Sequence, residues 1–107
     1  MMALKEILQK ASHERWAVPH FNIPNLEMLK AIVEACGEKK SPVMVGTSES
    51  EREFVGLEQA VALVKSYRDE FQLPIYLNAD HTKGVEKAKE AIDAGYDSIH
   101  IDLSKKN

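Results

Sequence analysis

The sequence predicts an α/β fold in which strands alternate with helices along the whole chain. Apolar runs begin near residues 16, 42, 74 and 97, and segments with helical spacing of apolar residues separate them. Such alternation is typical of a parallel sheet, because parallel neighbours need a long crossover connection. Each run also ends in polar residues, and parallel sheets bind their ligands at the carboxyl ends of strands.

The first three elements follow from apolar periodicity and local signals. Residues 3–12 carry apolar residues on one face, which predicts an amphipathic helix. Residues 16–23 are expected to form the first strand, although Pro19 removes one ladder hydrogen bond. Asn25 stands at an N-cap position, and apolar residues at helical spacing then predict a helix to about residue 38.

The middle of the chain repeats the pattern. Residues 43–48 form a second apolar run that ends in small polar residues. The acidic residues 49–53 are expected to be a loop at the end of this strand, and residues 57–70 to form another helix.

The last strand–helix–strand unit is the most informative. Residues 74–82 (PIYLNADHT) begin as a buried strand and end in an acid, an imidazole and a hydroxyl. Such groups are costly at the end of a buried strand unless they bind or react with something. Residues 85–94 predict a helix that ends at Gly95, and residues 98–102 a fourth strand.

The composition excludes several classes of protein. The chain has 107 residues and a formal net charge of −3, which argues against non-specific nucleic-acid binding. Its one cysteine, Cys36, lies in an apolar helical pattern and is expected to be a buried core residue. No run approaches the roughly 18 apolar residues of a membrane span. We therefore expect a cytoplasmic protein that binds neither membranes nor nucleic acid.

Four parallel strands could form an open doubly wound sheet or the first half of a (β/α)₈ barrel of the TIM type. The turn after the first strand has no glycine-rich phosphate fingerprint, which disfavours the open sheet. A complete barrel needs about 250 residues. We therefore expect residues 1–107 to be a single amino-terminal half-barrel segment. Its two unpaired edges and an apolar inner face would favour self-association, so a homo-oligomer is expected.

Five stretches carry a family resemblance, in order and over nearly the whole chain: 17–22 (AVPHFN), 31–35 (AIVEA), 41–43 (SPV), 78–81 (NADH), and 95–99 (GYDSI) followed by 101–102 (ID). Together they resemble the amino-terminal part of the class II fructose-1,6-bisphosphate aldolases, which are metal-dependent (β/α)₈ enzymes. The resemblance implies zinc-dependent cleavage of a ketose bisphosphate to dihydroxyacetone phosphate and an aldehyde. For fructose 1,6-bisphosphate, the aldehyde is glyceraldehyde 3-phosphate. Tagatose bisphosphate is the alternative substrate within the family.

The resemblance also implies roles for five residues. Asp80 is similar to the acid/base that acts at the C4 hydroxyl of the substrate, and His81 to the first metal-binding histidine. Asp102 is similar to an acidic residue near the metal, sometimes described as a secondary ligand, and is expected in the metal site with His81. Asn22 and Ser48 resemble contacts to the sugar phosphate. The family's other two histidine ligands, its glycine-rich phosphate loop and the glutamate of its mobile loop are expected beyond residue 107. An isolated monomer is therefore expected to be inactive and to bind zinc weakly.

The residue types at positions 80 and 81 suit this chemistry. Cleaving a carbon–carbon bond beside a ketone leaves a carbanion, which a divalent metal can stabilise while a carboxylate takes the hydroxyl proton. Taken alone, however, Asp80 could equally cap a helix, and His81 could be structural. Asp102 could orient a metal ligand or be an ordinary carboxylate at a strand end.

Two further histidines are expected to have structural roles, and one alternative to an enzyme is open. His100 shares parity with Asp102 and is expected to be packed inside, and His20 has no partner at metal-ligand spacing. If the chain did complete a site by association, these two would be the candidate extra ligands. The alternative to an enzyme is a non-catalytic βα fragment that associates with itself or with a complementary half.

Overall fold

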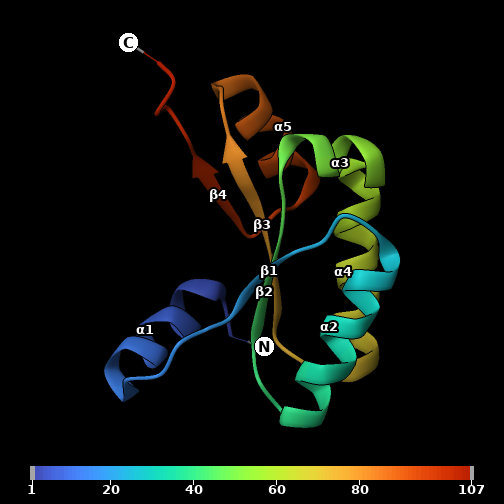
Figure 1. The fold of residues 1–107 in the computed structure, drawn as a ribbon. Helices are drawn as coiled ribbons and strands as arrows, with labels where there is room; N and C mark the ends of the chain where they lie inside the picture. The colour runs from blue at the N-terminus through green and yellow to red at the C-terminus, as the bar shows by residue number, and fades with distance from the viewer. Residues whose placement is uncertain (1, 107) are drawn as a thin grey trace.

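The computed structural model describes residues 2–106 and contains one four-stranded parallel sheet (Figure 1). The strands β1 (His20–Asn22), β2 (Val43–Thr47), β3 (Ile75–Thr82) and β4 (Ser98–Ile101) lie in the order 1-2-3-4. A doubly wound sheet reverses its strand order at a switch point, whereas a barrel keeps consecutive order. The predicted α/β fold, with four strands of a TIM-type barrel, is confirmed.

Five helices accompany the sheet within the described residues: α1 (Leu4–Glu14), α2 (Leu26–Lys39), α3 (Glu49–Val55), α4 (Leu57–Phe71) and α5 (Val85–Ala94). Helices α2 and α4 lie side by side on one side of the sheet, and α1 lies on the other (Figure 1). The chain just before α1 is held near the start of β3, where the Tyr76 hydroxyl donates to the Met2 carbonyl at 2.6 Å. Among residues 2–106, no helix combines the length and apolarity needed to cross a bilayer.

The hydrophobic core lies between the sheet and the crossover helices. Alternate strand residues, such as Val45 and Leu77, are fully buried there against Val33 and Val64. The buried Cys36 belongs to this core, as predicted. Burial of each such aliphatic side chain stabilises the fold by about 1.5–3 kcal/mol.

The opposite face of the sheet differs from the expectation. We expected an apolar inner face, but its carboxyl half carries polar side chains that hydrogen-bond across the strands: His20, Asn22, Asn78, Asp80, Ser98 and His100. The sequence shows this for β3 once the strand parity is applied, because Asn78 and Asp80 alternate with the core residues Leu77 and Ala79.

Residues 49–53 do not form the expected loop but begin helix α3. Ser48 is the N-cap: its Oγ accepts the Glu51 N–H at 3.3 Å, and the Ser48 N–H donates to Glu51 Oε1 at 2.8 Å. This reciprocal pair is a capping box, and the S-x-x-E pattern that announces it is present in the sequence. The start of this helix was not expected because the segment is rich in acidic residues.

Candidate functional site

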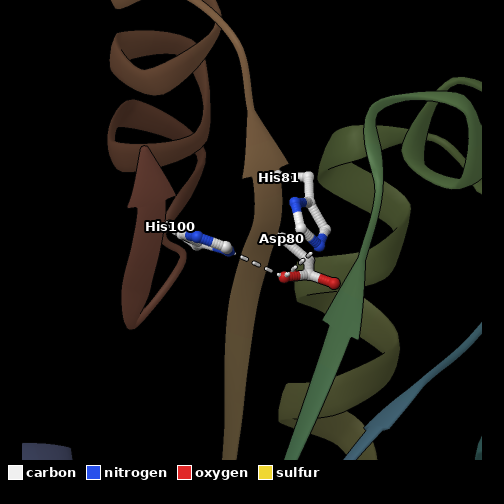
Figure 2. Close-up of side chains that lie close together, drawn as sticks. All are labelled: Asp80, His81 and His100. Atoms are coloured by element: carbon white, nitrogen blue, oxygen red, sulfur yellow. Dashed lines mark hydrogen bonds and ion pairs between the residues drawn. The ribbon is translucent and has the colours of Figure 1, made fainter. Parts of the chain in front are cut away.

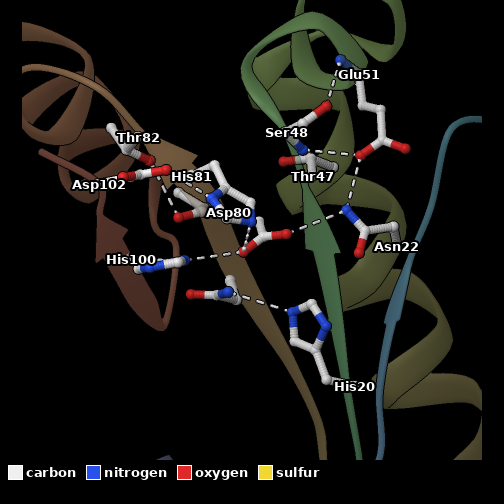
Figure 3. A network of polar contacts seen from close by, with 12 residues as sticks. His20, Asn22, Thr47, Ser48, Glu51, Asp80, His81, Thr82, His100 and Asp102 are labelled. Atoms are coloured by element: carbon white, nitrogen blue, oxygen red, sulfur yellow. Dashed lines mark hydrogen bonds and ion pairs between the residues drawn. The ribbon is translucent and has the colours of Figure 1, made fainter. Parts of the chain in front are cut away.

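The carboxyl ends of the four strands bring the predicted site residues into one region (Figure 3). Asn22 ends β1 and Ser48 follows β2, while Asp80 and His81 lie near the end of β3 and Asp102 directly follows β4. The first and last of these residues are 80 positions apart in sequence, but parallel strands of consecutive order place their ends side by side.

Asp80 is the centre of this region (Figure 2). Its Oδ1 lies 3.1 Å from His100 Nδ1 and 4.0 Å from His81 Nε2, and its Oδ2 accepts from Asn22 Nδ2 at 3.4 Å. Partial burial alone would raise the pKa of Asp80. Hydrogen bonds from His100 and Asn22 and the nearby His81 imidazole outweigh that effect, so the pKa lies below its usual value. Asp80 is therefore an ionised acceptor near neutral pH.

Asp80 does not cap the following helix. Helix α5 begins after Gly84 and has no side-chain cap, so the helix-cap interpretation of Asp80 is wrong.

A local distortion of β3 lets Asp80 and His81 share one side of the sheet. Neighbouring strand residues normally point to opposite faces. His81, however, has a φ of 41°, and the β3–β4 register shifts between Ala79 and Thr82. This left-handed conformation costs a non-glycine residue about 1–2 kcal/mol. The result is that both side chains reach the same end of the sheet.

Asp102 lies behind the His81 ring, on the side away from Asp80 (Figure 3). Its Oδ2 lies 2.8 Å from His81 Nδ1, and its Oδ1 accepts the Ser104 N–H at 3.0 Å. Contacts with Ser104, and then with His81, hold the pKa of Asp102 well below its usual range. The bond to Asp102, followed by the charge of Asp80, raises the pKa of His81. A carboxylate on Nδ1 fixes the ring and leaves Nε2 facing Asp80, as in many metal-bound histidines.

Glu51 is a site residue that the sequence analysis missed. Its Oε1 accepts from Asn22 Nδ2 at 3.0 Å as well as from the Ser48 N–H. Partial burial alone would raise the pKa of Glu51, but the Ser48 and Asn22 hydrogen bonds lower it overall. Both predicted substrate contacts, Asn22 and Ser48, are therefore held by one carboxylate. Ser48 also borders a cavity of about 310 Å³ with five other residues: Glu49, Ser50, Glu53, His81 and Lys83.

A second polar layer lies beside Asp80 on the same face of the sheet (Figure 3). Asn78 Nδ2 lies 3.2 Å from His20 Nε2, and the Ser98 hydroxyl donates to Asn78 Oδ1 at 2.7 Å. The His20 ring crosses β2 over Gly46, where an added Cβ would lie only 2.5 Å from His20 Nε2. Gly46 is thus required for this close approach.

Arg52, on α3, joins the ends of β2 and β3 from the helix side. Its guanidinium donates to the Thr47 carbonyl and, at 3.0 Å, to Thr82 Oγ1. It is 5% exposed. Residues 49–53 were expected to form a loop, so this role of Arg52 was not foreseen. Arg52 holds together the two strands that carry Ser48 and Asp80.

His100 also belongs to the site, although it was expected to be structural. Its side chain is 48% exposed and lies against Asp80, not packed in the interior as expected. The His81 and His100 ring centroids are 4.7 Å apart. One donor atom from each of Asp80, His81 and His100 lies within 4.8 Å of the others. Two imidazoles and a carboxylate form a donor set that suits zinc and similar divalent metals.

Comparison with known proteins adds independent support. Residues 2–107 match the family Fructose-bisphosphate aldolase class-II. The chain is 39% identical over 107 residues to a fructose-bisphosphate aldolase of Geobacillus stearothermophilus, covering 97% of this chain and 37% of that protein. It is 39% identical over 106 residues to a 6-phospho-5-dehydro-2-deoxy-D-gluconate aldolase of Bacillus licheniformis, covering 96% of this chain and 36% of that protein.

The fold is similar to that of solved aldolases. The YdjI aldolase from Escherichia coli K12 superposes with a TM-score of 0.87 and 26% identity, over 100% of this chain and 42% of that chain. The chain thus spans little more than a third of the length of the two curated relatives. Over that span, it belongs to the class II fructose-bisphosphate aldolase family.

Proposed function

We propose that this chain supplies the catalytic acid/base and part of the metal centre of an enzyme that cleaves a ketose bisphosphate by a reversible aldol reaction. The leading substrate is fructose 1,6-bisphosphate, with dihydroxyacetone phosphate and glyceraldehyde 3-phosphate as products. The observation that carries the proposal is the meeting of Asp80 and His81 at one strand end, with Asp102 behind His81. Family membership supports it.

The residues divide the work of the reaction. Asp80, an ionised carboxylate held by two hydrogen bonds, would take the C4 hydroxyl proton of the substrate in the cleavage direction and return it in condensation. Asn22 would hydrogen-bond a substrate oxygen beside it. Ser48, at the N-terminus of α3, would contact a phosphate.

His81 and Asp102 would serve the proposed zinc centre. His81 presents Nε2 as the ligand atom, and Asp102 fixes the orientation of its ring from Nδ1. A bound divalent cation would polarise the carbonyl oxygen of the substrate as a Lewis acid. The donor set is compatible with zinc, which accepts imidazole nitrogen and carboxylate oxygen.

Two alternatives follow from specific observations. One of the relatives is a 6-phospho-5-dehydro-2-deoxy-D-gluconate aldolase, so family membership alone does not determine which sugar is cleaved. Tagatose 1,6-bisphosphate is the alternative substrate that we retain.

In addition, β1 and β4 each have only one strand neighbour within the described residues. The chain by itself would then be a non-catalytic fragment that assembles with a second copy or with a complementary half. As an aldolase of sugar phosphates, the assembled enzyme would act in cytoplasmic carbohydrate metabolism such as glycolysis.

A chimaera tests the proposed activity. Residues 1–107 would replace the matching segment of the Geobacillus stearothermophilus aldolase, and cleavage of fructose and tagatose 1,6-bisphosphates would be measured with and without a chelator. We expect zinc-dependent cleavage, and a loss of about 10²–10⁴-fold in kcat/KM on Asp80→Asn. Asp69→Asn, which changes an exposed carboxylate on α4, is the matched control. Undiminished cleavage by the Asp80→Asn chimaera would remove Asp80 from the mechanism.

A further inference from the structure

We propose that His100 is a metal ligand, and that His81, His100 and Asp80 together hold one divalent cation within this chain. The inference deepens the proposed function and rests on it only for the presence of a metal at this strand end. The family resemblance gives His100 no role, and His100 was expected as an extra ligand only if a site formed by association; here it would bind the cation within one chain.

The distances favour a shared ion. A tetrahedral site with bonds of about 2.0–2.1 Å places its donor atoms about 3.3 Å apart. His100 Nδ1 lies 3.1 Å from Asp80 Oδ1, and His81 Nε2 lies 4.0 Å from the same oxygen. All three donors lie within 4.8 Å of one another. The donor atoms are therefore close to the spacing that a shared ion requires.

The orientation of the two rings supports the same conclusion. The rings are tilted by 52° with their centroids 4.7 Å apart, so they are not stacked face to face. Each presents a nitrogen toward Asp80 Oδ1 (Figure 2). The ring of His81 is fixed from behind by Asp102 at 2.8 Å, so one of the two imidazole ligands is already oriented.

Asp80 can bind a metal and also act as the acid/base because its two oxygens face different partners. Oδ1 faces the two imidazoles, while Oδ2 faces the Asn22 amide at 3.4 Å. The first oxygen is thus placed for the cation, and the second for a substrate hydroxyl bound beside Asn22. The donor set favours zinc or another imidazole-binding metal over calcium or magnesium, which prefer oxygen-only sites.

Calorimetric titration of the 107-residue chain with Zn²⁺ tests the proposal. We expect one saturable site, and at least about a tenfold loss of affinity in His100→Gln and in His81→Gln, because even an outer partner of a metal ligand is worth 10–100-fold. His13→Gln, on the exposed side of α1, is the matched control and should bind as the wild type. Far-ultraviolet circular dichroism establishes that each variant is folded.

A second variant reports ligation directly. His100→Cys should produce a thiolate-to-metal charge-transfer band with Co²⁺ that the wild type lacks; the wild type already carries the buried Cys36, so the band reports position 100. Wild-type affinity in His100→Gln, or no band in His100→Cys, would overturn the proposal. If His81→Gln alone weakens binding, the metal centre of the proposed function stands without His100. If neither substitution weakens binding, or if the wild-type chain shows no saturable site, both the assignment of His100 and the metal centre of the proposed function fail.

Discussion

Arg52→Met should destabilise the end of the sheet that carries the site. The Arg52 guanidinium is almost fully buried and donates to the Thr47 carbonyl and to Thr82 Oγ1. Its third contact, with the Asp80 carbonyl, is 3.5 Å long and contributes little. No ion pair of Arg52 occurs within residues 2–106. Its hydrogen-bond acceptors are therefore neutral oxygens.

The magnitude follows from two opposing contributions. A hydrogen bond with one charged partner stabilises by about 1.5–3 kcal/mol, so two contribute about 3–6 kcal/mol. Removing the guanidinium also relieves its desolvation cost, which offsets roughly half of that gain. Thr82 Oγ1 keeps a bond to the Ala79 carbonyl, so it is not left unpaired. We expect the free energy of unfolding to fall by about 1.5–3 kcal/mol.

Urea denaturation followed by circular dichroism measures this change. Lys65→Met removes an exposed cation on α4 and, as the control, should change the free energy of unfolding by less than about 1 kcal/mol. Arg52→Lys should lose at least as much stability as Arg52→Met, because a lysine cannot reach both acceptors and leaves a buried ammonium. An Arg52→Met variant as stable as the wild type would refute the reasoning, since desolvation would then outweigh the hydrogen bonds.

Two other substitutions test the packing around the site. The Tyr96 and Thr47 hydroxyls form a buried hydrogen bond of 2.8 Å. Tyr96→Phe removes it and should lower the free energy of unfolding by about 1–3 kcal/mol, because the Thr47 hydroxyl is left unpaired. Adding Thr47→Val should recover much of the lost stability, and urea denaturation midpoints measure both changes. Burial raises the pKa of Tyr96 above its unfolded value. The stability that the neutral Tyr96 adds to the fold is therefore complete below about pH 10 and is lost as the pH rises further. Tyr96→Phe should flatten this loss of stability, which urea denaturation midpoints at several pH values measure. Gly46→Ala would place a methyl 2.5 Å from His20 Nε2 and should cost about 1–3 kcal/mol by overpacking. Adding His20→Ala should restore most of that stability, and a neutral Gly46→Ala with His20 intact would contradict the close approach.

The strands could be predicted because each is a short apolar run bounded by proline, glycine or polar residues. The first was predicted over residues 16–23 but spans only His20–Asn22, next to Pro19, which has no N–H to donate. Helix α3 was not expected because its acidic composition suggested a loop. The Ser48 and Glu51 pair already matched the sequence pattern of a capping box. Local chemistry was sufficient there, and composition was misleading.

The site was only partly predictable for a geometric reason. Strand parity shows that His100 faces the same side of the sheet as Asp80, but it does not give the height of His100 along that face. The height depends on the stagger between β3 and β4, and this pair contains a register shift. Arg52 was out of reach for a related reason: its contacts with Thr47 and Thr82 exist only because residues 49–55 are helical.

The left-handed backbone of His81 sets stability against chemistry at a single position. Glycine adopts this conformation without strain, and asparagine with little, whereas histidine is destabilised by it. Directed evolution for thermal stability alone would therefore favour glycine or asparagine at position 81, and the imidazole side chain would be lost. Selection for activity would restore the histidine and the strain together, as expected where function depends on an unfavourable local conformation.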